Sequence, residues 1–170
     1  MRPLPVTLLL ALAPAAAAAQ PFAHSVGLEL GVSHDSAGPI GDRMPLALSA
    51  SWWLIGDLDV TARVAWGFAL RTAGCAADGP LEAGAGLRYS LAGLGAVRPQ
   101  LAVGAAYVLA WDARGPGGSD GVRLEGGVGL EWLLTRELGL ALLARASALW
   151  LDGEGWGGGF GGGVRLAYYF

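Results

Sequence analysis

The chain has 170 residues, enough for one domain of ordinary size, and an unusual composition. Hydrophobic residues make up 54% of it and charged residues only 15%, with 29 glycines and no lysine, so that all 11 basic residues are arginine. The formal net charge of −3 excludes the strongly basic surface typical of nucleic-acid-binding proteins, and we expect no nucleic-acid partner.

The first 19 residues have the features of a secretory signal peptide. Arg2 supplies a positive charge, the following stretch VTLLLALAPAAAAA is apolar, and the alanines at 17–19 suit a cleavage site. This apolar stretch is short for a transmembrane helix, which needs about 20 apolar residues. We therefore divide the chain into a signal peptide, 1–19, and a mature domain, 20–170.

The mature domain contains eight segments in which every second residue is apolar, the pattern of a β-strand with two different faces. In VGLELGV, for example, Val26, Leu28 and Leu30 share one face, and Gly27 and Glu29 share the other. In chain order the segments are 26–32, 46–54, 58–68, 81–89, 101–111, 122–132, 138–150 and 162–170. No charged residue falls on the apolar face of any segment.

The opposite face of these segments combines glycine and alanine with charged residues of both signs. Its charged residues are Glu29, Asp59, Glu82, Glu125 and Glu131, and Arg63, Arg88, Arg123, Arg145 and Arg165. Buried charges are tolerated when they are paired and hydrogen-bonded, and one arginine can bind more than one carboxylate. We predict that these side chains form a charge network inside a barrel.

The connections between the segments alternate in length, as expected when strands run up and down between two different environments. Four of them are long and rich in Gly, Pro and Asp: 33–45, 69–80, 112–121 and 151–161. Between these lie the tight connections 55–57 and 133–137, and the segment 90–100, whose last residues, Arg98 to Gln100, would extend the fifth strand.

Two kinds of eight-stranded barrel match this pattern. A soluble ligand-binding barrel such as a lipocalin has apolar residues inside, whereas a membrane barrel has an apolar outer band and a polar interior. The charged face carries much glycine and alanine and little net charge, which suits a narrow interior better than a soluble surface.

The aromatic residues lie near the ends of the segments, as in the two aromatic girdles of a membrane barrel. One set contains Trp66, Phe68, Trp111 and Trp150, and the other contains Trp52, Tyr89, Trp132, Tyr168 and Phe170. We therefore predict an all-β fold, an eight-stranded antiparallel up-and-down transmembrane β-barrel.

The whole mature chain resembles the small bacterial outer-membrane β-barrels of the OmpA-transmembrane-domain and OmpX type. The shared features are the signal peptide, the eight alternating segments, the alternating connections and the ending VRLAYYF. The resemblance implies an outer-membrane location after signal-peptide cleavage, with outer-membrane lipid as a partner. It also implies that Tyr168 and Phe170 are an assembly signal for the outer-membrane assembly machinery. We expect a monomer.

One polar cluster, SHDS at 33–36, suggests catalysis. His34 would act as a general base and Ser36 as a nucleophile, with Asp35 between them. Some barrels of this size modify lipid A with His and Ser near the outer rim. Asp and Ser are equally common in turns, where they form local hydrogen bonds, and we expect no enzyme.

The remaining chemical motifs are weak. The glycine-rich stretch GEGWGG matches the G-x-G-x-x-G spacing through its composition, without the following helix and acidic residue that a dinucleotide site needs. No His or Cys spacing indicates a metal site, and Cys75, the only cysteine, has no partner for an internal disulfide. We expect neither a cofactor nor a metal.

Four functions follow from this pattern. The first is a non-enzymatic outer-membrane barrel with a structural or surface-interaction role and a plugged, salt-bridged interior. The alternatives are a channel for small solutes or hydrophobic molecules, a lipid A-modifying enzyme that uses the SHDS segment, and a secreted lipocalin-like binder.

Overall fold

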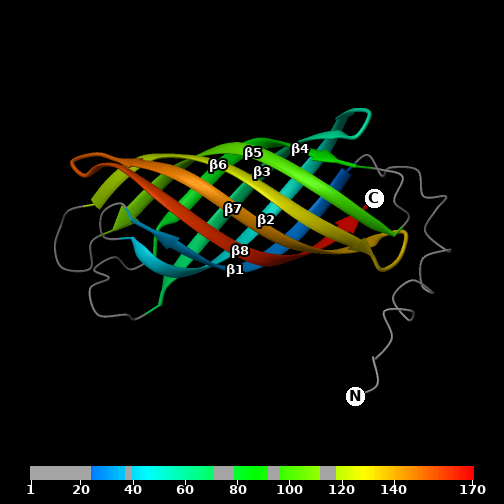
Figure 1. Cartoon of the computed structure of the whole chain (residues 1–170), viewed down its shortest axis with the longest axis horizontal. Helices are drawn as coiled ribbons and strands as arrows, with labels where there is room; N and C mark the ends of the chain where they lie inside the picture. The colour runs from blue at the N-terminus through cyan, green and yellow to red at the C-terminus, as the bar shows by residue number, and fades with distance from the viewer. Residues whose placement is uncertain (1–23, 37–39, 71–78, 92–95, 112–117) are drawn as a thin grey trace, which may run out of the picture.

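Eight β-strands, each paired with the next along the chain and the last paired with the first, close into a barrel in the computed structural model (Figure 1). The structure describes residues 24–36, 40–70, 79–91, 96–111 and 118–170. The strands are β1 (His24–Asp35), β2 (Gly41–Ile55), β3 (Leu58–Ala69), β4 (Leu81–Ser90), β5 (Val97–Trp111), β6 (Gly118–Leu133), β7 (Leu138–Leu151) and β8 (Gly155–Tyr169). All neighbouring pairs are antiparallel, so the predicted fold class is confirmed.

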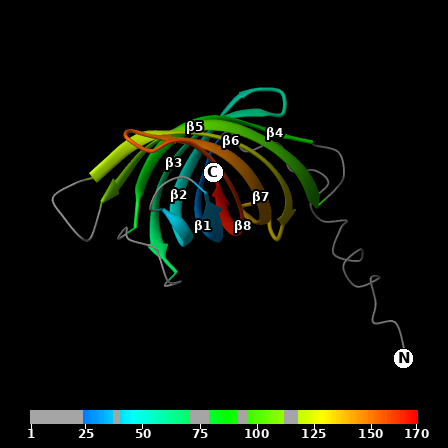
Figure 2. The same ribbon diagram turned by 60° about the vertical axis from the view of Figure 1, so that its left-hand side comes forward.

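The first and last strands close the barrel. They pair without interruption from Ser25 opposite Tyr169 to Asp35 opposite Gly159, and β1 and β8 lie side by side in both ribbon views (Figure 2). The amide of Phe170 also donates to the His24 carbonyl, with a distance of 3.1 Å. Because each unpaired backbone group in hydrocarbon costs several kcal/mol, closure removes the main obstacle to placing a sheet in a membrane.

The two ends of the barrel differ in what they carry. The beginning of β1 and the end of β8 lie at one end, here called the terminal end, together with the β2–β3 and β6–β7 turns (Figure 1). The β7–β8 turn lies at the opposite end, here called the distal end.

The strands at the distal end are longer than predicted. β1 continues to Asp35 and β2 begins at Gly41, while β6 begins at Gly118 and β8 at Gly155. The predicted long connection 151–161 is therefore a turn of residues 152–154, and the predicted alternation of long and short connections holds only in part. The missed portions of β6 and β8 are rich in glycine, which joins the backbone ladder without showing apolar alternation, and those of β1 and β2 are mostly polar or charged.

The two faces of the sheet separate as predicted for a membrane barrel. The outward Leu48 is 66% exposed, whereas the inward Glu29 is 2% exposed. The apolar residues therefore face outward, which contradicts the secreted lipocalin-like alternative. In the part of the chain that the structure describes, no helix has the length and hydropathy needed to cross a bilayer.

The aromatic residues of the two predicted girdles mostly lie on this outward face. Trp66 and Trp150 are exposed toward the distal end, and Tyr168 and Phe170 toward the terminal end. The predicted signal peptide, Cys75 and the side chain of Trp111 lie outside the residues that the structure describes.

Candidate functional site

The polar interior of the barrel is the candidate site, and its most buried part is a ring of four charged residues near the distal end. The distal ring consists of Asp35 on β1, Arg43 on β2, Glu82 on β4 and Arg123 on β6, each 3% exposed. Arg43 lies 3.1 Å from Asp35 and also pairs with Glu82. Arg123 lies 2.7 Å from Asp35 and 3.2 Å from Glu82, so each carboxylate is held by both arginines.

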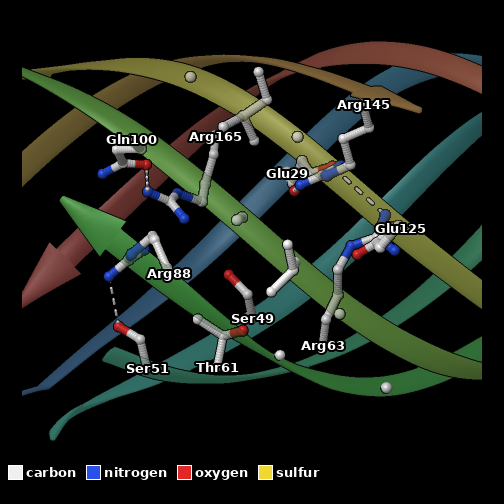
Figure 3. A pocket seen from close by; sticks show the side chains of 18 of the residues that line it. Glu29, Ser49, Ser51, Thr61, Arg63, Arg88, Gln100, Glu125, Arg145 and Arg165 are labelled. Atoms are coloured by element: carbon white, nitrogen blue, oxygen red, sulfur yellow. Dashed lines mark hydrogen bonds and ion pairs between the residues drawn. The ribbon is translucent and has the colours of Figure 1, made fainter. Parts of the chain in front are cut away.

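The middle of the interior is organised around Glu29. Both terminal nitrogens of Arg145 donate to its two carboxylate oxygens, with 2.6 Å between Nη2 and Oε2. Arg63 lies 3.5 Å from Glu29 and 3.5 Å from Glu82, which joins this group to the distal ring. Glu125 lies near Arg63 and Arg145 in the close view but forms no ion pair with any residue that the structure describes (Figure 3).

Two further groups occupy the terminal half. Arg88 donates to Asp59 through Nε and Nη2, at 3.1 and 2.6 Å, and to the Ser51 hydroxyl at 2.9 Å. The Ser51 hydroxyl is in turn 2.6 Å from that of Ser25. A chain of hydrogen bonds therefore links Asp59, Arg88, Ser51 and Ser25 in this part of the interior.

The second terminal group surrounds Glu131 on β6. Its carboxylate accepts from Arg165 at 3.2 Å, from the Gln100 amide at 2.8 Å and from the Tyr169 hydroxyl at 2.5 Å. Gln100 also accepts from Arg165 at 3.0 Å. A buried carboxylate with three donors is well compensated for its loss of water.

The ten charged residues predicted to face inward do so, and nine of them form ion pairs. The exception is Glu125. Sequence reasoning did not include Asp35 and Arg43 in the network, because both fell in the predicted connection 33–45. Their signal was present: Asp35 and Arg43 are in the same alternation frames as Glu29 and Ala47, whose side chains face inward.

The interior is filled more on one side than on the other. The inward positions of β4 to β6 include Gly84, Gly86, Gly104 and Gly127, and a cavity of about 80 Å³ lies along them. Across this cavity, Arg63, Arg145 and Glu29 gather in one group and Arg88, Arg165 and Gln100 in another (Figure 3). Since a water molecule occupies about 30 Å³ in the liquid, the cavity has room for a few waters.

Apolar clusters fill the two ends of the interior. The distal cluster contains Ile40, Val108, Ala110, Leu149 and Leu151. The terminal cluster contains Leu133, Ala167 and Tyr169. The ion pairs described above lie between these two clusters.

Ser33, His34 and Asp35 are the last residues of β1 and Ser36 follows directly after it, and the side chains of this SHDS segment do not converge. His34 faces outward, where its Nδ1 lies 2.7 Å from Asp42 Oδ1 and its ring lies 5.4 Å from that of Phe160. Asp35 faces inward as part of the distal ring. The Ser36 hydroxyl donates to the Gly158 carbonyl at 2.8 Å and accepts from the Gly158 amide at 3.0 Å. The structure therefore does not bring His34, Asp35 and Ser36 together, and it places Asp42 beside the histidine instead.

The residues predicted as an assembly signal are exposed at the end of the last strand. Tyr168 pairs with Val26 of β1 and Leu138 of β7, and its ring stacks on that of Phe170 at 6.4 Å. Among the residues that the structure describes, no three His, Cys, Asp or Glu side chains are grouped so that they could hold a metal ion.

Known proteins resemble this chain in structure rather than in sequence. No family model and no curated protein sequence matches it. The crystal structure of Neisserial surface protein A has a TM-score of 0.74 at 14% identity, covering 87% of this chain and 97% of that chain. The N-terminal β-barrel domain of Pseudomonas aeruginosa OprF has a TM-score of 0.59 at 16% identity, with coverages of 88% and 100%.

A third similar structure is that of the outer membrane enzyme PagL. Its TM-score is 0.52 at 17% identity, and the alignment covers 85% of this chain and 99% of that chain. At sequence identities this low, the structural similarity shows a shared fold and says nothing of a shared activity. The chain has the fold of the small eight-stranded outer-membrane β-barrels.

Proposed function

We propose that the protein is a barrel of the bacterial outer membrane with a structural or surface-interaction role, and that its interior does not conduct. The observation that carries the proposal is the set of buried ion pairs spread along the interior: one group from the distal ring to Glu29, and the separate pair of Glu131 with Arg165. An ion passing through would have to separate buried pairs, each of which is costly to break. An apolar cluster closes each side of this set.

Planar lipid bilayers test the proposal. The mature protein, refolded in detergent and checked by its heat-dependent gel migration, is added to the bilayer beside a porin as positive control. We expect the current to stay at the baseline under conditions in which the porin gives discrete steps. Reproducible steps from the wild-type barrel would favour the channel alternative instead.

The pair formed by His34 and Asp42 supports a second candidate, an esterase acting on acyl chains of outer-membrane lipid. A carboxylate that holds Nδ1 orients a histidine so that Nε2 can accept a proton, and Ser36 lies two residues after His34, just past the end of β1. To act as nucleophile, the Ser36 hydroxyl would have to leave Gly158 and turn toward His34. The similarity to PagL, an outer membrane enzyme, is compatible with this candidate.

Mass spectrometry of lipid A tests this candidate. The protein is expressed in a Gram-negative host, and the lipid A acylation pattern is compared with that from His34→Ala and Ser36→Ala. An esterase would remove an acyl chain in the wild type and in the control His24→Ala, and not in the other two variants. Identical lipid A in all four strains would eliminate the enzyme.

A further inference from the structure

The outward surface at the distal end of β5 to β8 combines carboxylates with exposed aromatic rings. We call it the acidic–aromatic rim, and it consists of Tyr107, Asp120, Trp150, Asp152, Glu154 and Trp156. All six residues are exposed, and Trp156, at 67%, is among the most exposed large side chains of the molecule. Its neighbours Gly155 and Gly157 have no side chains to cover it.

The rim is continuous across neighbouring strands. The amide of Asp152 donates to the carbonyl of Asp120 at 2.9 Å, which joins the β7–β8 turn to the start of β6. Trp150 is directly opposite Trp156. The Tyr107 hydroxyl donates to the carboxylate of Asp120, so that an aromatic ring and an acid are joined across β5 and β6.

The charges of the rim are not balanced in the way that those of the interior are. Inside the barrel nearly every carboxylate pairs with an arginine, whereas Asp120, Asp152 and Glu154 form no ion pair with any residue that the structure describes. Asp152 and Glu154 lie in the turn that projects from the distal end (Figure 1). Three carboxylates without an ion pair among the described residues thus lie beside three aromatic rings.

A cation is the partner that both parts of this surface attract. Carboxylates attract it by charge, and the faces of Trp and Tyr attract it through their negative π-surfaces. Arginine suits such a surface best, because its planar guanidinium can stack on a ring and donate to a carboxylate at once. Since the turn projects beyond the aromatic residues that mark the bilayer interface, the partner would approach from the water.

We propose that the acidic–aromatic rim docks an arginine-rich peptide segment of another protein. This inference deepens the proposed surface-interaction role by naming the chemistry of the partner, and it rests on that role. It does not depend on whether the interior conducts, so the bilayer measurement and the binding measurement can fail separately.

Isothermal titration calorimetry with octa-arginine as the probe tests the proposal. The mature barrel is held in micelles of a zwitterionic detergent at low salt, and the folded state of each variant is checked by heat-dependent gel migration. The test variants are Trp156→Ala and the double variant Asp152→Asn with Glu154→Gln. The matched controls at the terminal end are Trp52→Ala and Asp57→Asn, which remove an exposed ring and a turn carboxylate there.

We expect the wild type and both controls to bind octa-arginine equally, and each test variant to bind it at least about fivefold more weakly. Trp156→Phe should restore most of the lost affinity, since it replaces the ring. Binding should also weaken as salt is raised, because exposed charges are screened within about 10 Å at 0.1 M salt. Failure of the wild type to bind, or an equal loss of affinity in the test and control variants, would overturn the proposal.

Discussion

At the scale of single residues, two inward-facing carboxylates differ in their number of ion-pair partners, and we expect them to contribute differently to the stability of the barrel. Asp35 on β1 and Glu125 on β6 are both inward-facing acids at the same level of the barrel. Asp35 is shared by Arg43 and Arg123, whereas Glu125 forms no ion pair within the described structure. We therefore expect that removing the charge of Asp35 lowers the free energy of unfolding, and that removing the charge of Glu125 changes it little.

Asp35→Asn should destabilise the barrel strongly. The change leaves two buried guanidiniums with fewer partners, and breaking a buried ion pair on one side costs about 3–5 kcal/mol. Glu125→Gln is the matched control and should cost less than about 1 kcal/mol, a usual value for a change that breaks no pair. Equilibrium unfolding by urea in lipid vesicles measures both. Equal unfolding midpoints for the two variants would contradict the distal ring as a stabilising element.

The last two tyrosines provide a second comparison between residues. Tyr169 faces inward and donates to Glu131 at 2.5 Å, while Tyr168, one residue earlier, faces outward. Tyr169→Phe should cost about 1.5–3 kcal/mol, the value of a hydrogen bond to a charged group. Tyr168→Phe should leave the free energy of unfolding almost unchanged. Urea unfolding in lipid vesicles measures both variants. If Tyr168→Phe lowers the free energy of unfolding as much as Tyr169→Phe does, the hydrogen bond from Tyr169 to Glu131 is not the cause of the loss.

At the scale of the strands, the sequence predicts the existence and the facing of all eight, and it fails at their distal ends. Alternation identifies a strand only where one face is apolar, as in β3 with Val64 and Trp66 outward. In β8 the inward positions from Gly155 to Gly163 are all glycine, and Gly158 and Gly162 also stand on the outward face. Backbone hydrogen bonds keep this part of β8 in the sheet, and no alternation of side chains indicates the strand in the sequence.

Because alternation identifies a strand only where one face is apolar, only part of the site could be predicted from the sequence. The inward arginines of the strand centres follow from alternation alone. Asp35 and Arg43 required the strand ends to be placed correctly. The pairing of His34 with Asp42 required the register between β1 and β2, which places these residues opposite each other and which no local pattern specifies.

The close approach of β1 and β8 makes the glycines of this seam a test of the strand pairing. A Cβ added at Gly31 would lie 2.5 Å from the Gly162 carbonyl oxygen, so the two strands would have to move apart. Gly31→Ala should therefore destabilise the barrel by about 1–3 kcal/mol, as overpacking does. The control Gly158→Ala adds a Cβ with nothing within 4 Å. A lower temperature of heat-dependent migration for Gly31→Ala than for Gly158→Ala is the expected result, and the reverse order would contradict the seam geometry.

At the scale of the whole molecule, the barrel is inside out relative to a soluble domain, and its interior is nearly neutral. The interior charge network contains six carboxylates, namely Glu29, Asp35, Asp59, Glu82, Glu125 and Glu131, and six arginines, namely Arg43, Arg63, Arg88, Arg123, Arg145 and Arg165. Neutrality removes the net repulsion that would otherwise favour opening a charged core. The exterior then needs only to match lipid.

A role of Phe170 in assembly can be tested separately from a role in stability. Phe170 is exposed, and its ring stacks on Tyr168 and lies 5.9 Å from that of His24. If Phe170 is part of an assembly signal, Phe170→Ala should reduce the folded protein in the outer membrane of living cells severalfold, while the barrel refolded in detergent keeps its stability to within about 1 kcal/mol, the usual range for a surface change. Phe160→Ala removes an outward ring from β8, the strand that Phe170 follows, and is the control. Quantitative blotting of membrane fractions, with heat-dependent migration as the measure of folding, compares the two variants. Equal amounts of folded protein for Phe170→Ala and Phe160→Ala would contradict an assembly role that is specific to Phe170.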